Sequence, residues 1–169
     1  MDLDYYINNK IKVDDEFIKD AAEKIRQIKE LGPSIYQLLI IGKIESLKSN
    51  LSAYLAKEGS FEYTHVLSNF NMIGMSERDK IFEFKKVFDI AYENKNSCIV
   101  IDGLETLIEY HRDIKTNKLR FMTFLFNTIK TLLHKHPVNK ECKILVIINS
   151  IKMPGLDLDD YVQDYLIIE

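Results

Sequence analysis

The chain has little of what marks several specialised classes of protein. It has two cysteines, Cys98 and Cys142, and no apolar run near the about 20 residues that a membrane span needs. Its net charge is −3, without a dense stripe of lysine and arginine, and no Ser-His-Asp or Cys-His arrangement is visible. We therefore expect reduced thiols, no membrane insertion and no nucleic acid partner. The first residues, MDLDYYINNK, lack the apolar core of a signal peptide, so nothing suggests secretion.

What the chain does have is the composition of one soluble domain, with 46% hydrophobic and 29% charged residues over residues 1–169. Continuously apolar segments are typical of strands buried on both faces of a parallel sheet. We expect such strands at residues 35–41, 97–101 and 143–149. An alternating, half-buried strand is expected at residues 61–67 and a short last strand at residues 165–168. Segments with helical spacing of apolar residues separate them, at residues 15–31, 48–57, 76–91 and 119–133. This alternation predicts a single α/β domain of about five strands.

The first apolar strand runs into a loop of the kind that binds phosphate. Such a loop has the pattern G-x-x-x-x-G-K-[ST]. Its glycines let backbone N–H groups turn toward the phosphates, its lysine reaches the β- and γ-phosphates, and its hydroxyl binds Mg²⁺. Residues 42–49 have the right length and keep the first glycine, the lysine and the serine. The candidate nucleotide-binding residues here are Gly42, Lys43, Ile44, Glu45, Ser46, Leu47, Lys48, Ser49 and Asn50.

Two residues weaken this loop. Leu47 replaces the second glycine, and its Cβ disfavours positive φ and crowds the phosphate side. Glu45 adds a carboxylate, and a like charge ~5 Å from a phosphate costs on the order of 3 kcal/mol at an effective dielectric near 20. Lys43 offsets part of that cost if it folds inward. A plain strand–loop–helix turn is therefore the alternative to a phosphate site.

A second apolar strand supports the phosphate site, because residues 98–102 end in Asp102, where an acid that organises Mg²⁺ belongs. The next position usually carries the acid that activates the attacking water, and here it is Gly103. Glu105 follows at the expected start of a helix, where the helix dipole favours an acid without any catalytic role. Asp102 and Glu105 are the candidate catalytic residues, with a helix-start carboxylate as the alternative for Glu105.

Four segments also carry a resemblance to a known family. Residues 72–77 are similar to the motif M-I-G-F-S-E, residues 85–92 to K-K-I-F-D-D-A-Y, and residues 97–105 to S-C-V-V-V-D-D-I-E. Residues 6–11 are similar to Y-I-M-N-G-I, a segment that backs the adenine in such domains. By these segments the chain resembles the second ATPase domain of N-ethylmaleimide-sensitive factor, in the vesicle-fusing AAA+ ATPase family. The resemblance covers essentially the whole chain.

The resemblance implies a P-loop NTPase (AAA+) fold, a three-layer α/β core with a five-stranded parallel sheet of order 5-1-4-3-2. It implies ATP and Mg²⁺ as cofactors. Lys48 would be the phosphate lysine, Ser49 the Mg²⁺ hydroxyl and Asp102 the second-strand acid that also holds the metal. The polar sensor after the fourth strand would be Asn149 or Ser150.

The same resemblance places residues 1–13 near the adenine, with Tyr6, Ile7 and Ile11 as candidate contacts. The family loop reads G-P-P-H-S-G-K-T, so this chain loses both prolines and the second glycine, and it lacks the second acid at Gly103. The chain also stops just after the expected fifth strand. The C-terminal helical lid that closes over nucleotide is therefore expected to be missing.

For function, the resemblance implies a cytoplasmic protein, peripheral to transport-vesicle and Golgi membranes, that acts as a homohexamer in SNARE-complex disassembly. Adaptor and SNARE contacts would belong to other domains of the whole protein. Our leading interpretation is a degenerate AAA+ domain that binds ATP and helps to hold the hexamer, with weak or no hydrolysis. One alternative is an interaction module that keeps the fold without binding nucleotide. Another is a working ATPase that uses Glu105.

Overall fold

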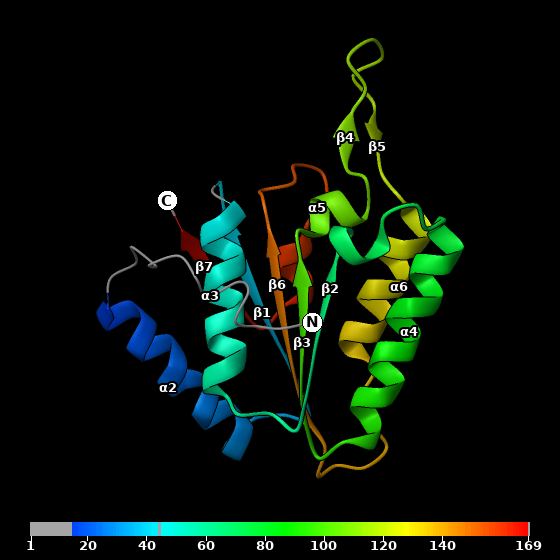
Figure 1. Cartoon of the computed structure of the whole chain (residues 1–169). Helices are drawn as coiled ribbons and strands as arrows, with labels where there is room; N and C mark the ends of the chain where they lie inside the picture. Colours follow the sequence, from blue (N-terminus) through cyan, green and yellow to red (C-terminus); the bar gives the residue numbers. More distant parts are fainter. Residues whose placement is uncertain (1–14, 44, 169) are drawn as a thin grey trace.

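A parallel sheet with helices on both faces forms the centre of the molecule (Figure 1). The computed structural model describes residues 15–43 and 45–168. Its strands are hydrogen-bonded in the order β2-β3-β6-β1-β7. When the five strands are numbered 1 to 5 along the chain and read from the β7 edge, this is the order 5-1-4-3-2. The predicted topology is therefore confirmed. The bounds of these strands are β1 Ile35–Gly42, β2 Tyr63–Ser68, β3 Asn96–Asp102, β6 Lys143–Ser150 and β7 Asp164–Ile168.

Two pairs of helices cover the sheet, and the three layers are visible in Figure 1. One face carries α2 (Asp15–Leu31) and α3 (Glu45–Glu58), and the other carries α4 (Glu77–Glu93) and α6 (Thr123–His134). Among the described residues, no helix combines the length and the apolar character that crossing a bilayer requires. The shorter elements are η1 Asn69–Met72, α5 Leu104–Leu107, β4 His111–Arg112, β5 Leu119–Arg120 and η2 Leu158–Tyr161.

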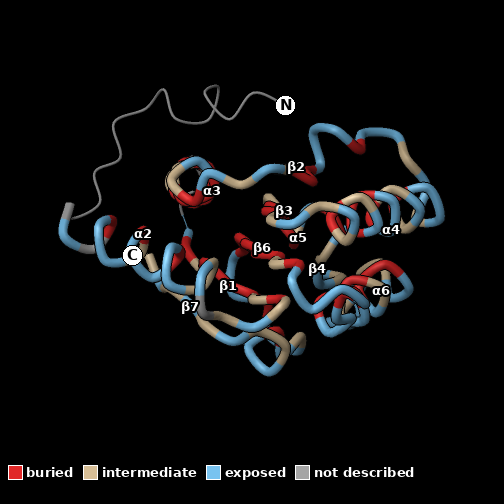
Figure 2. Tube along the Cα trace, turned by 90° about the horizontal axis from the view of Figure 1, so that it is seen from below, coloured by how far each residue is buried: buried red, intermediate tan, exposed pale blue. Residues whose placement is uncertain are grey.

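The strands contribute alternate side chains to two separate cores. In β1, Ile35 and Leu39 pack with α4 and α6, whereas Leu38 and Ile40 pack with α2 and α3. Figure 2 shows the central strands buried along most of their length. Burial on both faces is why these segments read as continuous apolar runs, and each such side chain contributes roughly 1.5–3 kcal/mol. Both cysteines are buried and free, as expected.

Two helix starts predicted from the sequence are wrong. The helix expected from residue 119 begins at Thr123, because Leu119–Arg120 pairs instead with His111–Arg112 in a hairpin. The helix expected from residue 48 begins at Glu45, inside the predicted phosphate loop. The predicted N-terminal segment near the adenine lies outside the described residues, so its placement stays a prediction.

We expect Ile40→Ala to lower the free energy of unfolding by about 2–5 kcal/mol, because Ile40 is 0% exposed and its truncation leaves a cavity under α2 and α3. The matched control is Ile167→Ala on β7, where the side chain is 63% exposed and the expected change is within about 0.5 kcal/mol. Urea unfolding followed by circular dichroism measures both. Equal effects would contradict the two-sided burial of the central strand.

Candidate functional site

Several of the predicted site residues, Lys48, Ser49, Asp102, Glu105 and Asn149, lie at the edge of the sheet where β1, β3 and β6 end. These strands end at Gly42, Asp102 and Ser150, and β6 lies between the other two. Since parallel strands run in one direction, their carboxyl ends meet at a single edge, the upper one in Figure 1. Ligands of open α/β sheets bind at such an edge.

The last residue of β1, Gly42, is closely packed against its neighbours. A Cβ at Gly42 would lie 2.9 Å from the Ile168 carbonyl oxygen and 3.4 Å from Lys48 Cγ, so a side chain would force its neighbours apart. Because α3 already begins at Glu45, the backbone from residue 45 to 49 is helical. The N–H groups of residues 45–48 are therefore those of a helix first turn, which have no partner within the helix itself.

Lys48 lies in the first turns of α3 with its amine deep inside the protein. The residue is 1% exposed, and Nζ has no hydrogen-bond partner among the described residues. Its charge is balanced by Glu105, whose Oε1 lies 3.8 Å away, beyond hydrogen-bonding distance. Taking an ammonium out of water costs several kcal/mol unless hydrogen bonds replace the hydration. The site therefore holds a buried cation whose donors meet no hydrogen-bond acceptor in the part of the chain that the structure describes.

Glu105 occupies the position facing this cation. Besides the contact with Lys48, its Oε2 accepts a hydrogen bond from Ser150 Oγ at 2.9 Å and one from Ile151 N at 3.3 Å. These are the kinds of donors, an ammonium, a hydroxyl and a backbone amide, that would surround a bound phosphate oxygen. The Glu105 carboxylate thus acts as an internal anion in the site.

Asp102 joins three segments through one oxygen. Its Oδ1 accepts hydrogen bonds from Ser49 Oγ and from Asn149 Nδ2, both at 2.6 Å. Asn149 Nδ2 also lies 3.2 Å from Ser52 Oγ. The two sensor candidates are thereby distinguished, since Asn149 contacts Asp102 and Ser150 contacts Glu105. Sequence reasoning missed Ser52, although its spacing from Ser49 places both hydroxyls on one side of the helix.

The backbone conformation at Gly103, the position where a second acid usually follows the strand, favours glycine. The residue has φ 71° and ψ 60°, in the left-handed region, and its amide donates to Asn149 Oδ1 at 2.6 Å. A Cβ there would come within 3.0 Å of Thr106 Oγ1. A side chain at this position is strained on both counts, so glycine is favoured. The turn at Gly103 then starts α5, which carries Glu105.

Ser49 and Asp102 together are suited to Mg²⁺. A hydroxyl and a carboxylate are hard oxygen ligands, and this cation takes one or two such groups together with substrate phosphates and water. The buried amine of Lys48 beside them fits the phosphates that would complete the set. No cluster of three or more acidic, histidine or cysteine side chains that could hold a metal alone occurs in residues 15–43 and 45–168.

The other candidate residues of the phosphate loop differ in their exposure to solvent. Lys43 is exposed rather than folded inward, Leu47 is half-buried and Asn50 is buried. Tyr6, Ile7, Ile11 and Ile44 lie outside the described residues, as do the side chains of Glu45 and Ser46.

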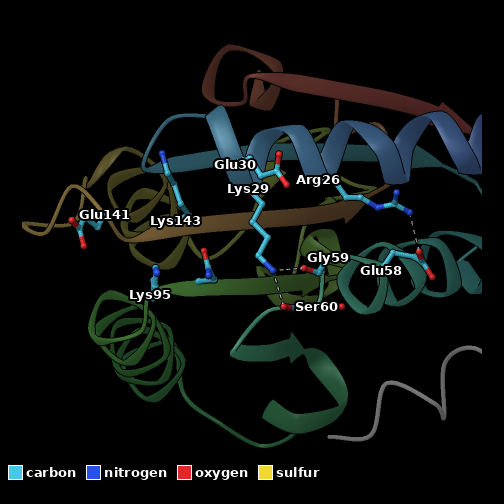
Figure 3. A pocket seen from close by; sticks show the side chains of 10 residues that line it. Arg26, Lys29, Glu30, Glu58, Gly59, Ser60, Lys95, Glu141 and Lys143 are labelled. Atoms are coloured by element: carbon cyan, nitrogen blue, oxygen red, sulfur yellow. Dashed lines mark hydrogen bonds and ion pairs between the residues drawn. The ribbon is translucent and has the colours of Figure 1, made fainter.

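A pocket lies at the opposite, amino end of the strands and has a volume of about 570 Å³ (Figure 3). Lys29 Nζ donates there to the carbonyls of Gly59 and Ser60, each at 2.8 Å, and Arg26 lies 3.8 Å from Glu58. These cations are engaged within the protein, and carboxylates share the pocket with them. We therefore place the nucleotide candidate at the carboxyl edge and not here.

Comparison with known proteins supports the fold. No family model matches the chain. It is 31% identical over 134 residues to the vesicle-fusing ATPase of Dictyostelium discoideum, an alignment that covers 79% of this chain and 18% of the relative. It is 34% identical over 129 residues to the vesicle-fusing ATPase of Arabidopsis thaliana, covering 76% and 17%.

The vesicular-fusion protein sec18 of Schizosaccharomyces pombe is 26% identical over 152 residues, covering 89% of this chain and 19% of the relative. The chain thus spans less than a fifth of the length of these relatives. The similarity runs over most of this chain, so it extends well beyond the eight residues of the phosphate loop.

We expect Asn149→Asp to destabilise the protein in a pH-dependent way. A second carboxylate would face Asp102 across 2.6 Å, and repulsion raises the pKa of one of the two above its unfolded value. Stability is then kept at low pH, where that group is protonated, and is lost as pH rises above about 4, by about 3 kcal/mol at neutral pH.

Urea unfolding at several pH values, relative to wild type, measures this effect. Asn127→Asp, an exposed change of equal charge on α6, is the control and should leave stability within about 0.5 kcal/mol of wild type. A loss at Asn149 that does not vary with pH would show that the amide does not face the Asp102 carboxylate.

Proposed function

Since this chain is an AAA+ domain of the kind that the vesicle-fusing ATPases contain, we propose that it binds ATP with Mg²⁺ weakly and hydrolyses it poorly or not at all. Its role in the whole protein is to hold nucleotide and to support assembly of a hexamer. The observation that carries this proposal is the buried amine of Lys48, which lacks a hydrogen-bond partner among the described residues and lies beside the Ser49–Asp102 pair.

The chemistry of these three residues supports nucleotide binding. Lys48 would donate to phosphate oxygens, with first-turn amides of α3 beside it. Ser49 and Asp102 would hold Mg²⁺, and the bound cation would neutralise part of the phosphate charge. Asn149 positions Asp102 through its 2.6 Å hydrogen bond, so the acid is already oriented toward the helix.

Weak affinity follows from Glu105. Its carboxylate takes up Lys48, Ser150 and the Ile151 amide, which a phosphate would otherwise use. An incoming nucleotide must displace this internal anion, and the early start of α3 leaves fewer loop amides to compensate. The domain therefore binds nucleotide against a competing group of its own.

Poor hydrolysis follows from the same geometry. A general base must be within reach of the attacking water. The usual position holds Gly103, and the nearest alternative along the chain, Glu105, is engaged by a cation and two hydrogen-bond donors. We therefore propose that Glu105 forms an ion pair with Lys48 that competes with phosphate, and that it is not the general base of an active ATPase.

The setting of the whole protein is part of the proposal. We propose that the chain belongs to a cytoplasmic assembly, peripheral to transport-vesicle and Golgi membranes, that separates SNARE complexes with an adaptor bound through other domains. The names of the relatives, vesicle-fusing ATPase and vesicular-fusion protein, support this setting. The α/β domain of this chain would form part of each subunit of a homohexamer.

One observation favours a different function. Because α3 begins at Glu45, much of the expected phosphate cradle is helix, which suits a domain that keeps the AAA+ fold only as an interaction module. In that case the Lys48–Glu105 pair is a structural ion pair. Nucleotide titration distinguishes the two functions.

Titration with a fluorescent ATP analogue and Mg²⁺ should give saturable binding to wild type that Lys48→Met weakens by about 10- to 100-fold, since charged hydrogen bonds contribute roughly 1.5–3 kcal/mol. Methionine keeps the buried volume and removes the charge. The matched control is Lys80→Met, because Lys80 is also buried, at 2% exposure, but donates to the Leu107 carbonyl. Absent binding, or binding insensitive to Lys48→Met, would favour the interaction module.

We expect Glu105→Gln to strengthen binding of the same analogue by about tenfold, equal to about 1.4 kcal/mol, because it removes the competing charge. Glu109→Gln is the control, since Glu109 lies 3.7 Å from the other buried lysine, Lys80, outside the site. Phosphate release by wild type is measured in parallel. Release that disappears in Glu105→Gln, with affinity unchanged, would assign Glu105 as a catalytic base.

A further inference from the structure

A two-stranded hairpin projects beyond the carboxyl edge of the sheet (Figure 1). Its strands β4 and β5 pair antiparallel, with His111 opposite Arg120. At its base, Tyr110 Oη donates to the Pro154 carbonyl at 2.9 Å, which fixes the hairpin to the segment after β6. The hairpin therefore stands on the domain as an anchored projection.

Hydrogen bonds to Asp113 fix the shape of the hairpin tip. Its Oδ1 accepts from the backbone amides of Lys115 and Thr116, both at 2.9 Å, and its carbonyl accepts from Asn117 N at 2.8 Å. Those amides hold the pKa of the Asp113 carboxyl below its ordinary value. The one acid of the hairpin is thus used inside the turn, where its Oδ2 also lies 3.6 Å from Arg120 Nε, so Arg120 is paired within the hairpin. The tip that Asp113 shapes presents Ile114.

The exposed surface of the hairpin combines an exposed apolar side chain with several exposed cations. Ile114 is 98% exposed at the tip. Residues 111–120 hold four cationic side chains and one carboxylate, a net +3 in a chain whose net charge is −3. The four cationic residues are all exposed: Arg112, Lys115, Lys118 and Arg120.

We propose that this hairpin docks the domain on a membrane surface that contains anionic lipids. Lysines and arginines near such a surface are attracted to its headgroups, and an apolar side chain at the tip gains by entering the boundary between headgroups and acyl chains. Ile114 reaches only this boundary, and within residues 15–43 and 45–168 no helix is suited to crossing the bilayer. The contact is peripheral and depends on salt.

The shape of the hairpin favours a lipid surface over an acidic protein segment. Peptides are held in grooves or along open strand edges, where several side chains and backbone groups contact them together. Here the cations belong to a projecting hairpin that carries a nearly fully exposed isoleucine in its turn. A soft, anionic, partly apolar surface complements that shape.

Sedimentation with vesicles of phosphatidylcholine, with and without phosphatidylserine, tests the proposal on the 169-residue chain. Wild type should bind only the vesicles that contain phosphatidylserine, and added salt should release it. Ile114→Ser should weaken binding about fivefold, as expected for partial burial of an isoleucine. Val138→Ser is its matched control, because Val138 is equally exposed, at 103%, on another loop.

The charge contribution has its own pair of variants. Lys115→Ser with Lys118→Ser should weaken binding about 30-fold, at about fivefold for each cation. Lys85→Ser with Lys140→Ser removes the same charge from exposed positions elsewhere and should have much less effect. Thermal unfolding of each variant checks that the fold is intact.

Three outcomes would overturn the proposal. They are no binding to phosphatidylserine vesicles, equal losses in the hairpin variants and their controls, and binding of poly-glutamate as tight as that of the vesicles with the same dependence on Ile114. The last outcome would assign the hairpin to an acidic protein partner. Nucleotide binding is expected to be unaffected in the hairpin variants, so this test is independent of the phosphate site.

Discussion

The carboxylate of Asp102 is the contact on which the rest of the site depends. One of its oxygens accepts from Ser49 at the start of α3 and from Asn149 near the end of β6, so it fixes the helix and two strands relative to each other. The other end of the Asn149 amide accepts from Gly103 N, which sets the turn into α5. Through these bonds, the positions of Lys48 on α3 and Glu105 on α5 are tied to a single half-buried acid.

Much of the fold could be predicted because burial on both faces leaves a strong pattern in the sequence. The segments that became β1, β3 and β6 are continuously apolar, and the order of the sheet followed from the family resemblance. The hairpin at residues 111–120 could not be predicted in this way. It is held by polar contacts around Asp113, while Leu119 and Met122 happen to continue the apolar spacing of α6. Local turn hydrogen bonds outweigh helical periodicity there.

The candidate site could be predicted by residue but not by geometry. Lys48, Ser49 and Asp102 follow from strand ends and motif spacing, and the structure brings them together. The spacing could not tell whether Asn149 or Ser150 faces Asp102, because neighbouring residues of a strand point to opposite faces, and one position of register decides between them. Nor could it show that Glu105 turns back toward Lys48, since this depends on the left-handed conformation of Gly103.

The residues that depart from an ordinary phosphate loop, Leu47, Gly103 and Glu105, are structurally linked. Glycine is less favourable in a helix than leucine by about 1 kcal/mol, so Leu47 allows α3 to start earlier, at Glu45. An earlier helix shortens the loop that would hold a phosphate, while Lys48 remains buried and needs an anion near it. Glu105 supplies that anion, and Gly103 provides the turn that delivers it. Restoring glycine at residue 47 alone would therefore leave the internal carboxylate in place, and the loop and the glutamate have to be considered together.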